Sequence, residues 1–238
     1  MRVLVWNCSM SLRKKLDVVM RLAPDIAVIG NSEFPDKLYP GSGPRISGSL
    51  WFGNDRKSGL GIYSFGKWRI QPHAMQDPSV KTLVPVECSN DDMAFLLLAF
   101  HGTPASGRQG YGKAFQDYPL ALRYIENIRG RTAIFSGELG ESAPSRWTSE
   151  QGEGGYSDLE QVLAQADLRS CYHSFTRETP GREKTPTLYQ ERDLKQGVHT
   201  TCCFASTDLL LGLEDVQVGR PETWLDYSEH MPLVVDFA

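Results

Sequence analysis

Residues 132–140 constrain the fold more than any other stretch of the sequence. The apolar run Thr132-Ala133-Ile134-Phe135 stops abruptly at Ser136 and gives way to Gly137-Glu138-Leu139-Gly140. β-forming apolar residues followed by turn residues predict a buried strand that carries one carboxylate, Glu138, to its carboxyl end, where loops build functional sites. A strand that ends in a turn with a charged residue is also common without any function. Glu138 alone therefore leaves both interpretations open.

The same arrangement recurs along the chain, because several apolar runs stop at polar side chains that can bind a cation or a phosphate. These polar residues are Asn7, Asn31 or Glu33, His101, Glu138, and Glu229 with His230. A turn would explain Asn7 as well as a metal does, and a structural role would explain His101 as well as a phosphate contact does. Asn31 and Glu33 share strand parity, so they would face the same side of an extended chain.

Helical periodicity appears between the strand-like runs. Apolar residues recur at helical spacing over residues 12–20, 117–128 and 157–166, which predicts three amphipathic helices. Further strands are predicted at residues 3–6, 24–30, 51–53, 59–64, 68–73, 82–86, 93–100, 199–204, 216–218 and 233–237. The strands over residues 51–86 suggest a predominantly antiparallel sheet, and the order of strands and helices is compatible with an α/β fold.

Composition limits the class of protein. A chain of 238 residues with 40% hydrophobic content can bury a sizeable core, and we expect one domain over residues 1–238. The formal net charge of -4 argues against broad, non-specific nucleic-acid binding, although a local basic groove remains compatible with it. Five cysteines without metal-knuckle spacing indicate a reducing compartment, and no stretch resembles a membrane span or signal segment. We therefore expect a cytoplasmic protein that does not bind membranes.

The order of the motifs resembles the endonuclease/exonuclease/phosphatase superfamily, which includes pancreatic deoxyribonuclease. The segments that carry the resemblance are Trp6-Asn7, Pro24-Asp25-Ile26, Phe100-His101-Gly102-Thr103-Pro104, residues 132–140, and Ser228-Glu229-His230-Met231-Pro232. They span almost the whole chain. The resemblance implies an α/β fold, a four-layer αββα sandwich of two mostly antiparallel sheets flanked by helices, with the site at one end of the sheets.

The chain departs from the family pattern at the positions that matter most for chemistry. The family has a metal-binding Glu where this chain has Asn31, Asp where it has Glu138, Asn where it has Gly140, Asp where it has Thr201, and Asp where it has Glu229. Thr201 in place of Asp implies that His230 lacks the carboxylate that would orient it. An error of about 1 Å in a catalytic group costs on the order of a hundredfold in rate. The resemblance therefore implies a degenerate active site.

Two functional hypotheses follow, from different classes. In the first, the chain is a nuclease-like, metal-dependent phosphodiester hydrolase with an altered metal centre that acts on nucleic acid or another phosphoester. The candidate ligands for Mg²⁺ or Mn²⁺ are Asn7, Asn31, Glu33 and Glu229, and the candidate catalytic residues are Glu138, His230 and His101. In the second, it is a catalytically inactive member that binds nucleic acid or a protein partner. Polar strand ends without a shared site are a third interpretation.

Overall fold

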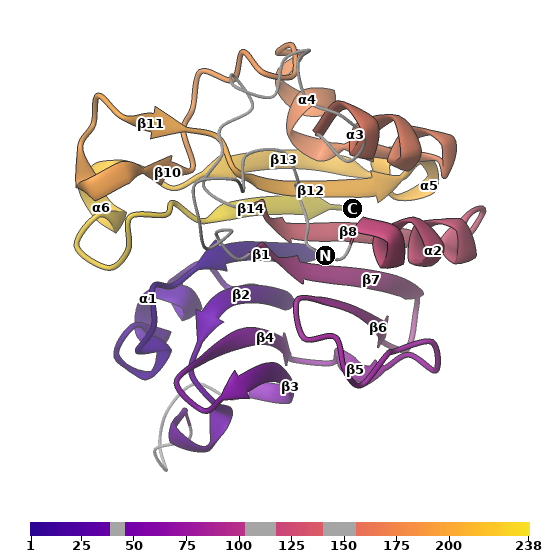
Figure 1. Cartoon of the computed structure of the whole chain (residues 1–238), viewed down its shortest axis with the longest axis horizontal. Helices are drawn as coiled ribbons and strands as arrows, with labels where there is room; N and C mark the ends of the chain where they lie inside the picture. The colour runs from indigo at the N-terminus through magenta and orange to yellow at the C-terminus, as the bar shows by residue number, and fades with distance from the viewer. Residues whose placement is uncertain (39–45, 103–117, 140–155) are drawn as a thin grey trace.

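The computed structural model describes residues 1–38, 46–102, 118–139 and 156–238, and its strands form two six-stranded sheets (Figure 1). The first sheet contains, in spatial order, β13 (Leu213–Val218), β14 (Leu233–Phe237), β1 (Arg2–Asn7), β2 (Ile26–Ser32), β4 (Ser58–Phe65) and β3 (Ile46–Asp55). The second contains β5 (Arg69–Pro72), β6 (Leu83–Ser89), β7 (Ala94–His101), β8 (Ala133–Glu138), β12 (Thr201–Ser206) and β9 (Leu168–Ser170). Neighbouring strands are antiparallel except for β1 with β2 and β7 with β8, which are parallel.

The remaining elements are short, apart from two helices. The helices are α1 (Leu16–Arg21), α2 (Tyr118–Ile128), α3 (Tyr156–Gln165), α4 (Cys171–Thr176), α5 (Thr207–Leu210) and α6 (Pro221–Trp224). In the described ranges, 3-10 turns cover Leu12–Lys14, Pro35–Lys37 and Gln190–Arg192, and β10 (Leu188–Tyr189) pairs with β11 (Gly197–Val198) in a small hairpin. No helix in the described part of the chain is long and apolar enough to cross a membrane.

Alternating side chains divide the core into layers. In β1, Val3 and Val5 face the other sheet and pack in the core between the sheets, whereas Leu4 and Trp6 face outward toward α1 and α6. On the second sheet, Phe135 of β8 faces outward and packs with residues of α2 and α3. Successive side chains of a strand point to opposite faces of the sheet. Because the other sheet covers one face and helices cover the other, both faces of these strands are apolar. The predicted four-layer αββα sandwich is confirmed, with α2 and α3 on one outer face and α1 and α6 on the other (Figure 1).

The predicted helix over residues 12–20 is wrong in its form. A 3-10 turn covers Leu12–Lys14, and α1 begins only at Leu16, because Lys15 at the junction has φ −122° and ψ 1°, outside the helical region. Leu12 and Leu16 are nevertheless buried, as their spacing predicts. Packing against the sheet therefore buries the apolar side chains of this segment on one face, although the helix is interrupted at Lys15.

Strand pairing brings the polar strand ends to one edge of each sheet. In the first sheet, Asn7 at the end of β1 is the register partner of Gly30 in the parallel strand β2. In the second sheet, His101 at the end of β7 is the partner of Glu138 at the end of β8, and Glu138 is also opposite Thr201 at the start of β12. The carboxyl ends of parallel strands lie at the same edge of a sheet, so the fold gathers these side chains.

Candidate functional site

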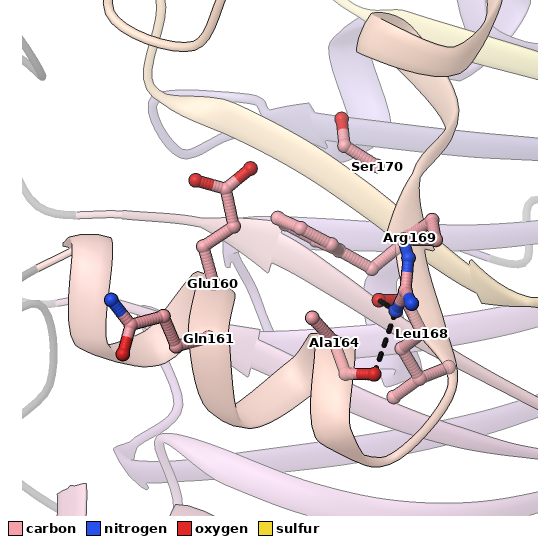
Figure 2. A pocket seen from close by; sticks show the side chains of 7 residues that line it. Glu160, Gln161, Ala164, Leu168, Arg169 and Ser170 are labelled. Atoms are coloured by element: carbon pink, nitrogen blue, oxygen red, sulfur yellow. Dashed lines mark hydrogen bonds between the residues drawn. The ribbon is translucent and has the colours of Figure 1, made fainter.

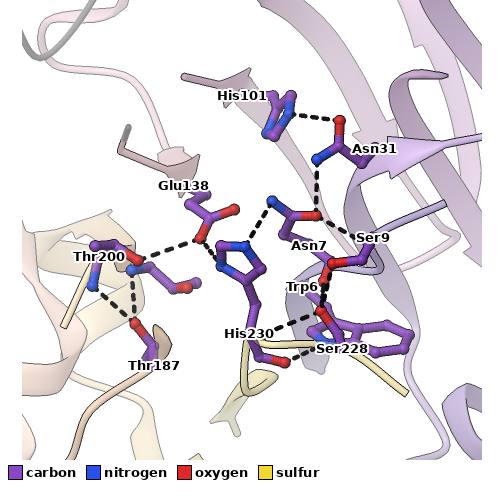
Figure 3. Close-up of polar contacts among 11 residues, drawn as sticks. Trp6, Asn7, Ser9, Asn31, His101, Glu138, Thr187, Thr200, Ser228 and His230 are labelled. Atoms are coloured by element: carbon purple, nitrogen blue, oxygen red, sulfur yellow. Dashed lines mark hydrogen bonds and ion pairs between the residues drawn. The ribbon is translucent and has the colours of Figure 1, made fainter. Parts of the chain in front are cut away.

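Glu138 and His230 form the centre of the site (Figure 3). Glu138 Oε1 forms an ion pair with His230 Nδ1 and also accepts a 3.2 Å hydrogen bond from Thr200 Oγ1. On the other side of the ring, His230 Nε2 lies 3.2 Å from Asn7 Nδ2. An amide nitrogen can only donate, so His230 Nε2 is the acceptor and the proton lies on Nδ1, facing the carboxylate. Glu138 and Asn7 together fix the tautomer of His230.

A chain of amides links this pair to the second histidine. Asn31 Nδ2 donates to Asn7 Oδ1 at 3.1 Å, and Asn31 Oδ1 accepts a 2.9 Å hydrogen bond from Ser58 Oγ. His101 Nε2 lies 3.3 Å from the same oxygen of Asn31 and donates to it. His101 Nδ1 makes no hydrogen bond with the described residues and packs against Gly30, where an added Cβ would lie 2.5 Å from it. The two histidines thus belong to one hydrogen-bonded network (Figure 3).

Hydrogen bonds from three residues hold the segment before β14 in place, and these contacts could not be predicted from local sequence patterns. Trp6 Nε1 donates to the His230 carbonyl at 2.8 Å. Ser228 Oγ donates to the Asn7 carbonyl at 2.7 Å and accepts from the His230 backbone N–H at 3.0 Å. Thr200, which contacts Glu138, was also not identified from sequence. The only signals were that Ser228 precedes His230 by two residues and that Trp6 precedes Asn7.

The structure brings together Asn7, Asn31, His101, Glu138 and His230, but not the other two predicted metal ligands. Glu33 accepts from the Arg13 backbone N–H at 2.9 Å and forms an ion pair with its guanidinium. Asn31 has φ 52°, and the pairing of β2 is irregular before Ser32, so Asn31 and Glu33 do not continue one extended strand. The Glu229 side chain makes no hydrogen bond or ion pair with the described residues, whereas its carbonyl accepts from Tyr189 N.

The expectation that His230 lacks an orienting carboxylate is wrong. Thr201 and Glu138 are register partners on neighbouring strands, and Glu138 reaches His230 from the position opposite Thr201. Opposed residues on one face of an antiparallel pair have their Cβ atoms about 4.5–5.5 Å apart, so the longer side chain of Glu138 can serve a histidine that an Asp on β12 would otherwise contact. Gly140, the other altered position in this segment, lies outside the described residues.

Burial and mutual charge control the protonation of these groups. Burial alone would raise the pKa of the Glu138 carboxyl, but the charge of His230 and its hydrogen bond hold that pKa below its usual value. Burial lowers the pKa of the His101 imidazole; the nearby Glu138 opposes this shift and His230 adds to it. At neutral pH the centre therefore contains an ionised Glu138 and a neutral His101.

A divalent cation fits these donors poorly. Asn7 Oδ1 accepts from Ser9 N and Asn31 Nδ2, Asn31 Oδ1 accepts two further hydrogen bonds, and Glu138 Oε1 is used by His230 and Thr200. Each amide oxygen has two lone pairs, so both amides are saturated. Among the described residues, no group of three or more His, Cys, Asp and Glu is arranged to hold a metal.

A cation that bound here would have to break these hydrogen bonds, and the free-energy cost is comparable with the binding free energy of a weak cation site. A buried donor that loses its acceptor costs about 1–3 kcal/mol, and a millimolar site supplies only about 4 kcal/mol. Glu138 Oε2 and the hydroxyl of Thr201 remain without hydrogen bonds from described residues, which gives one carboxylate oxygen and one neutral oxygen. Mg²⁺ requires near-octahedral oxygen coordination and loses water reluctantly. The described residues do not fit Mg²⁺ or Mn²⁺.

A separate cavity of about 330 Å³ lies between α3 and β9 (Figure 2). The residues that line it are Glu160, Gln161, Ala164, Leu168, Arg169, Ser170 and Phe204. The guanidinium of Arg169 donates to the carbonyls of Ala164 and Leu168 at 2.7 and 3.2 Å, so part of its hydrogen-bonding capacity is used within the fold. The cavity shares no residue with the Glu138–His230 network, which remains the stronger candidate site.

Acidification should destabilise the protein before any carboxylate is protonated. Because folding lowers the pKa of His101, the unfolded chain binds more protons below the ordinary histidine pKa of about 6.5, and stability falls as pH decreases through that value. We expect the urea midpoint to fall between about pH 7.5 and about pH 5.5. His199, whose pKa burial also lowers, contributes in the same direction. A smaller slope in His101→Gln would support the assignment, whereas an unchanged slope would contradict it.

No protein-family model and no curated protein matches the sequence. Solved structures do. An AP endonuclease from Leishmania major aligns with a TM-score of 0.73 at 12% identity, covering 98% of this chain and 86% of that chain. An AP endonuclease from Archaeoglobus fulgidus aligns with a TM-score of 0.66 at 16% identity, covering 100% and 99%. The 3'-5' exonuclease NExo from Neisseria meningitidis gives 0.64 at 16% identity, with 100% and 99% covered. The chain therefore shares its fold with these AP endonucleases and this exonuclease.

Proposed function

We propose that the chain is a phosphodiester hydrolase that acts on nucleic acid at the Glu138–His230 centre. The observation that carries this proposal is the orientation of His230, whose Nδ1–H faces Glu138 and whose Nε2 is an acceptor. A histidine held in this way by a carboxylate is suited to take a proton at its other ring nitrogen, once Asn7 Nδ2 no longer donates to that nitrogen.

The chemical step is general-base hydrolysis. His230 Nε2 takes a proton from water while the water oxygen forms a bond to phosphorus. The bond from phosphorus to the leaving oxygen breaks, and that oxygen receives the proton from the imidazolium. Glu138 stabilises the imidazolium, and the amide N–H groups of Asn7 can donate to a phosphate oxygen. General-base catalysis of this kind contributes about 10²–10⁴-fold in rate.

The solved structures with this fold support nucleic acid as the substrate class. They include the endonuclease domain of TRAS1, a telomere-specific retrotransposon, with a TM-score of 0.64 at 16% identity. They also include a 3' phosphatase, NExo from Neisseria, bound to a product DNA hairpin, with a TM-score of 0.65. These activities belong to those proteins, and the shared fold supports a nucleic-acid substrate for this chain.

A second candidate function is a nucleic-acid-binding module without turnover, and one observation favours it. The amide oxygens of Asn7 and Asn31 already accept their full number of hydrogen bonds, and the carboxylate of Glu33 is paired with Arg13. The oxygen atoms that would bind a water-activating metal are therefore occupied by contacts within the protein. A protein of this fold can keep its binding surface while its chemistry is lost. A protein partner would be a third possibility of the same class.

The test is cleavage and binding of labelled single- and double-stranded DNA and RNA by the wild type and by His230→Ala. We expect the wild type to cleave at least one of them, and His230→Ala to bind it while cleaving it about 10²–10⁴-fold more slowly. His73→Ala is the matched control, because His73 also faces a carboxylate, with Nε2 3.7 Å from Glu87, but lies outside the network. Binding without cleavage by the wild type would favour the second candidate, and neither binding nor cleavage would reject both.

A further inference from the structure

A divalent cation performs two tasks at a phosphodiester centre, and the contact between Glu138 and His230 offers a side-chain counterpart for each. A cation neutralises a buried carboxylate and presents positive charge to the phosphate. Here the imidazole of His230 lies against the carboxylate of Glu138, and the two side chains expose 12% and 6% of their surface. On the opposite side of the ring, Nε2 accepts from Asn7 Nδ2, and a proton taken in place of that hydrogen bond gives Nε2 a positive N–H. The side chains themselves therefore supply the charge.

The backbone conformation at Asn31 also disfavours a glutamate ligand at this position. Asn31 has φ 52°, in the left-handed region that Asn tolerates better than most residues. Its carbonyl accepts hydrogen bonds from Met10 N at 3.0 Å and from Cys8 Sγ at 3.3 Å, which fix this conformation. The side chain then lies between Asn7 and His101, where its amide donates to one and accepts from the other. Asn31 thus functions as a hydrogen-bonding bridge in the place of a cation ligand.

We propose that this centre takes no divalent cation and that the Glu138–His230 pair cleaves the phosphodiester, with the amide of Asn7 as a donor to the phosphate. The inference rests on the proposed function for the cleavage step, but its statement about the cation can be tested independently of activity. The balanced step is the one given above, with water as nucleophile and His230 carrying the proton from water to the leaving oxygen. It requires no co-reactant beyond water.

Calorimetric titration of Mg²⁺ and of Mn²⁺ into the wild type tests the cation directly. We expect no saturable binding at millimolar concentrations. Thr201→Asp should add a second carboxylate opposite Glu138, and we expect it to bind Mn²⁺ at least about tenfold more tightly than the wild type does, because affinity rises with ligand charge. Saturable Mn²⁺ binding by the wild type that Glu138→Gln removes would overturn the inference. Far-UV circular dichroism of each variant verifies that the fold is retained.

Cleavage in EDTA and in Mg²⁺ separates failure of this inference from failure of the proposed function. We expect equal rates under the two conditions for the wild type. Cleavage that stops in EDTA and returns with Mg²⁺ would overturn the inference while leaving the hydrolase proposal intact. No cleavage under either condition would reject the hydrolase proposal and, with it, the cleavage step of this inference.

Discussion

Replacing Glu138 with glutamine is expected to lower the rate of phosphodiester cleavage by about 10²–10⁴-fold. Glutamine can still accept the hydrogen bonds that Glu138 Oε1 receives from His230 and Thr200, so the orientation of the imidazole is retained in part. The negative charge that stabilises the protonated imidazole is lost. Single-turnover rates across pH measure the effect, and the pH profile should change together with the rate, which loss of structure alone would not produce.

Two variants bracket this result. Glu138→Asp keeps the charge but shortens the side chain by one methylene, so we expect a loss on the order of a hundredfold through misplacement. Asp91→Asn is the control, because Asp91 forms an exposed ion pair with Arg69 before β7, at the other end of that strand from His101. An unchanged rate in Glu138→Gln would show that the carboxylate does not support the chemistry.

Gly137→Ala is expected to destabilise the protein by about 3 kcal/mol or more. A Cβ on Gly137 would lie 2.0 Å from the carbonyl oxygen of Phe100, which belongs to the backbone of the neighbouring strand β7. A backbone atom cannot move aside as a flexible side chain can, so β7 and β8 would have to separate. The midpoint of urea unfolding, at an unchanged slope, measures the loss.

Gly212→Ala provides the comparison. The nearest atom to its Cβ would be the Cβ of Ala238 at 3.4 Å, an ordinary contact, so we expect a change within about 1 kcal/mol. Equal effects of the two substitutions would contradict the close approach of β7 and β8. Because Gly137 directly precedes Glu138, a folded Gly137→Ala protein should also show weakened cleavage.

Most strands could be predicted from sequence because each is a local pattern. The run before His101 and the run before Glu138 became β7 and β8, and the apolar run before Asn7 became β1. The interruption between Leu12–Lys14 and α1 was missed, since helical spacing of apolar residues does not reveal a local change of backbone conformation. One domain for residues 1–238 and a cytoplasmic location stay predictions.

The site could be predicted as a set of residues but not as a set of contacts. Asn7, His101, Glu138 and His230 were identified from sequence. The carboxylate that orients His230 was expected at the position of Thr201, where the resembled family has Asp, and was therefore judged to be missing. The pairing of Glu138 with His230 depends on the register of β8 against β12, which no local pattern specifies. Glu33 was assigned to a metal because its partner Arg13, 20 residues earlier in the chain, could not be foreseen.

The position of β14 in the first sheet affects the order in which the protein can fold. β14 lies between β13 and β1, so the last strand of the chain pairs with the first, Arg2 opposite Asp236. β1 can pair with β2 through local contacts, but its other edge stays open until residues 233–237 are in place. Contacts of such large sequence separation slow folding, and an open apolar strand edge invites aggregation. Asn7 and His230 lie 223 residues apart, so the centre is assembled only when this distant pairing closes the first sheet.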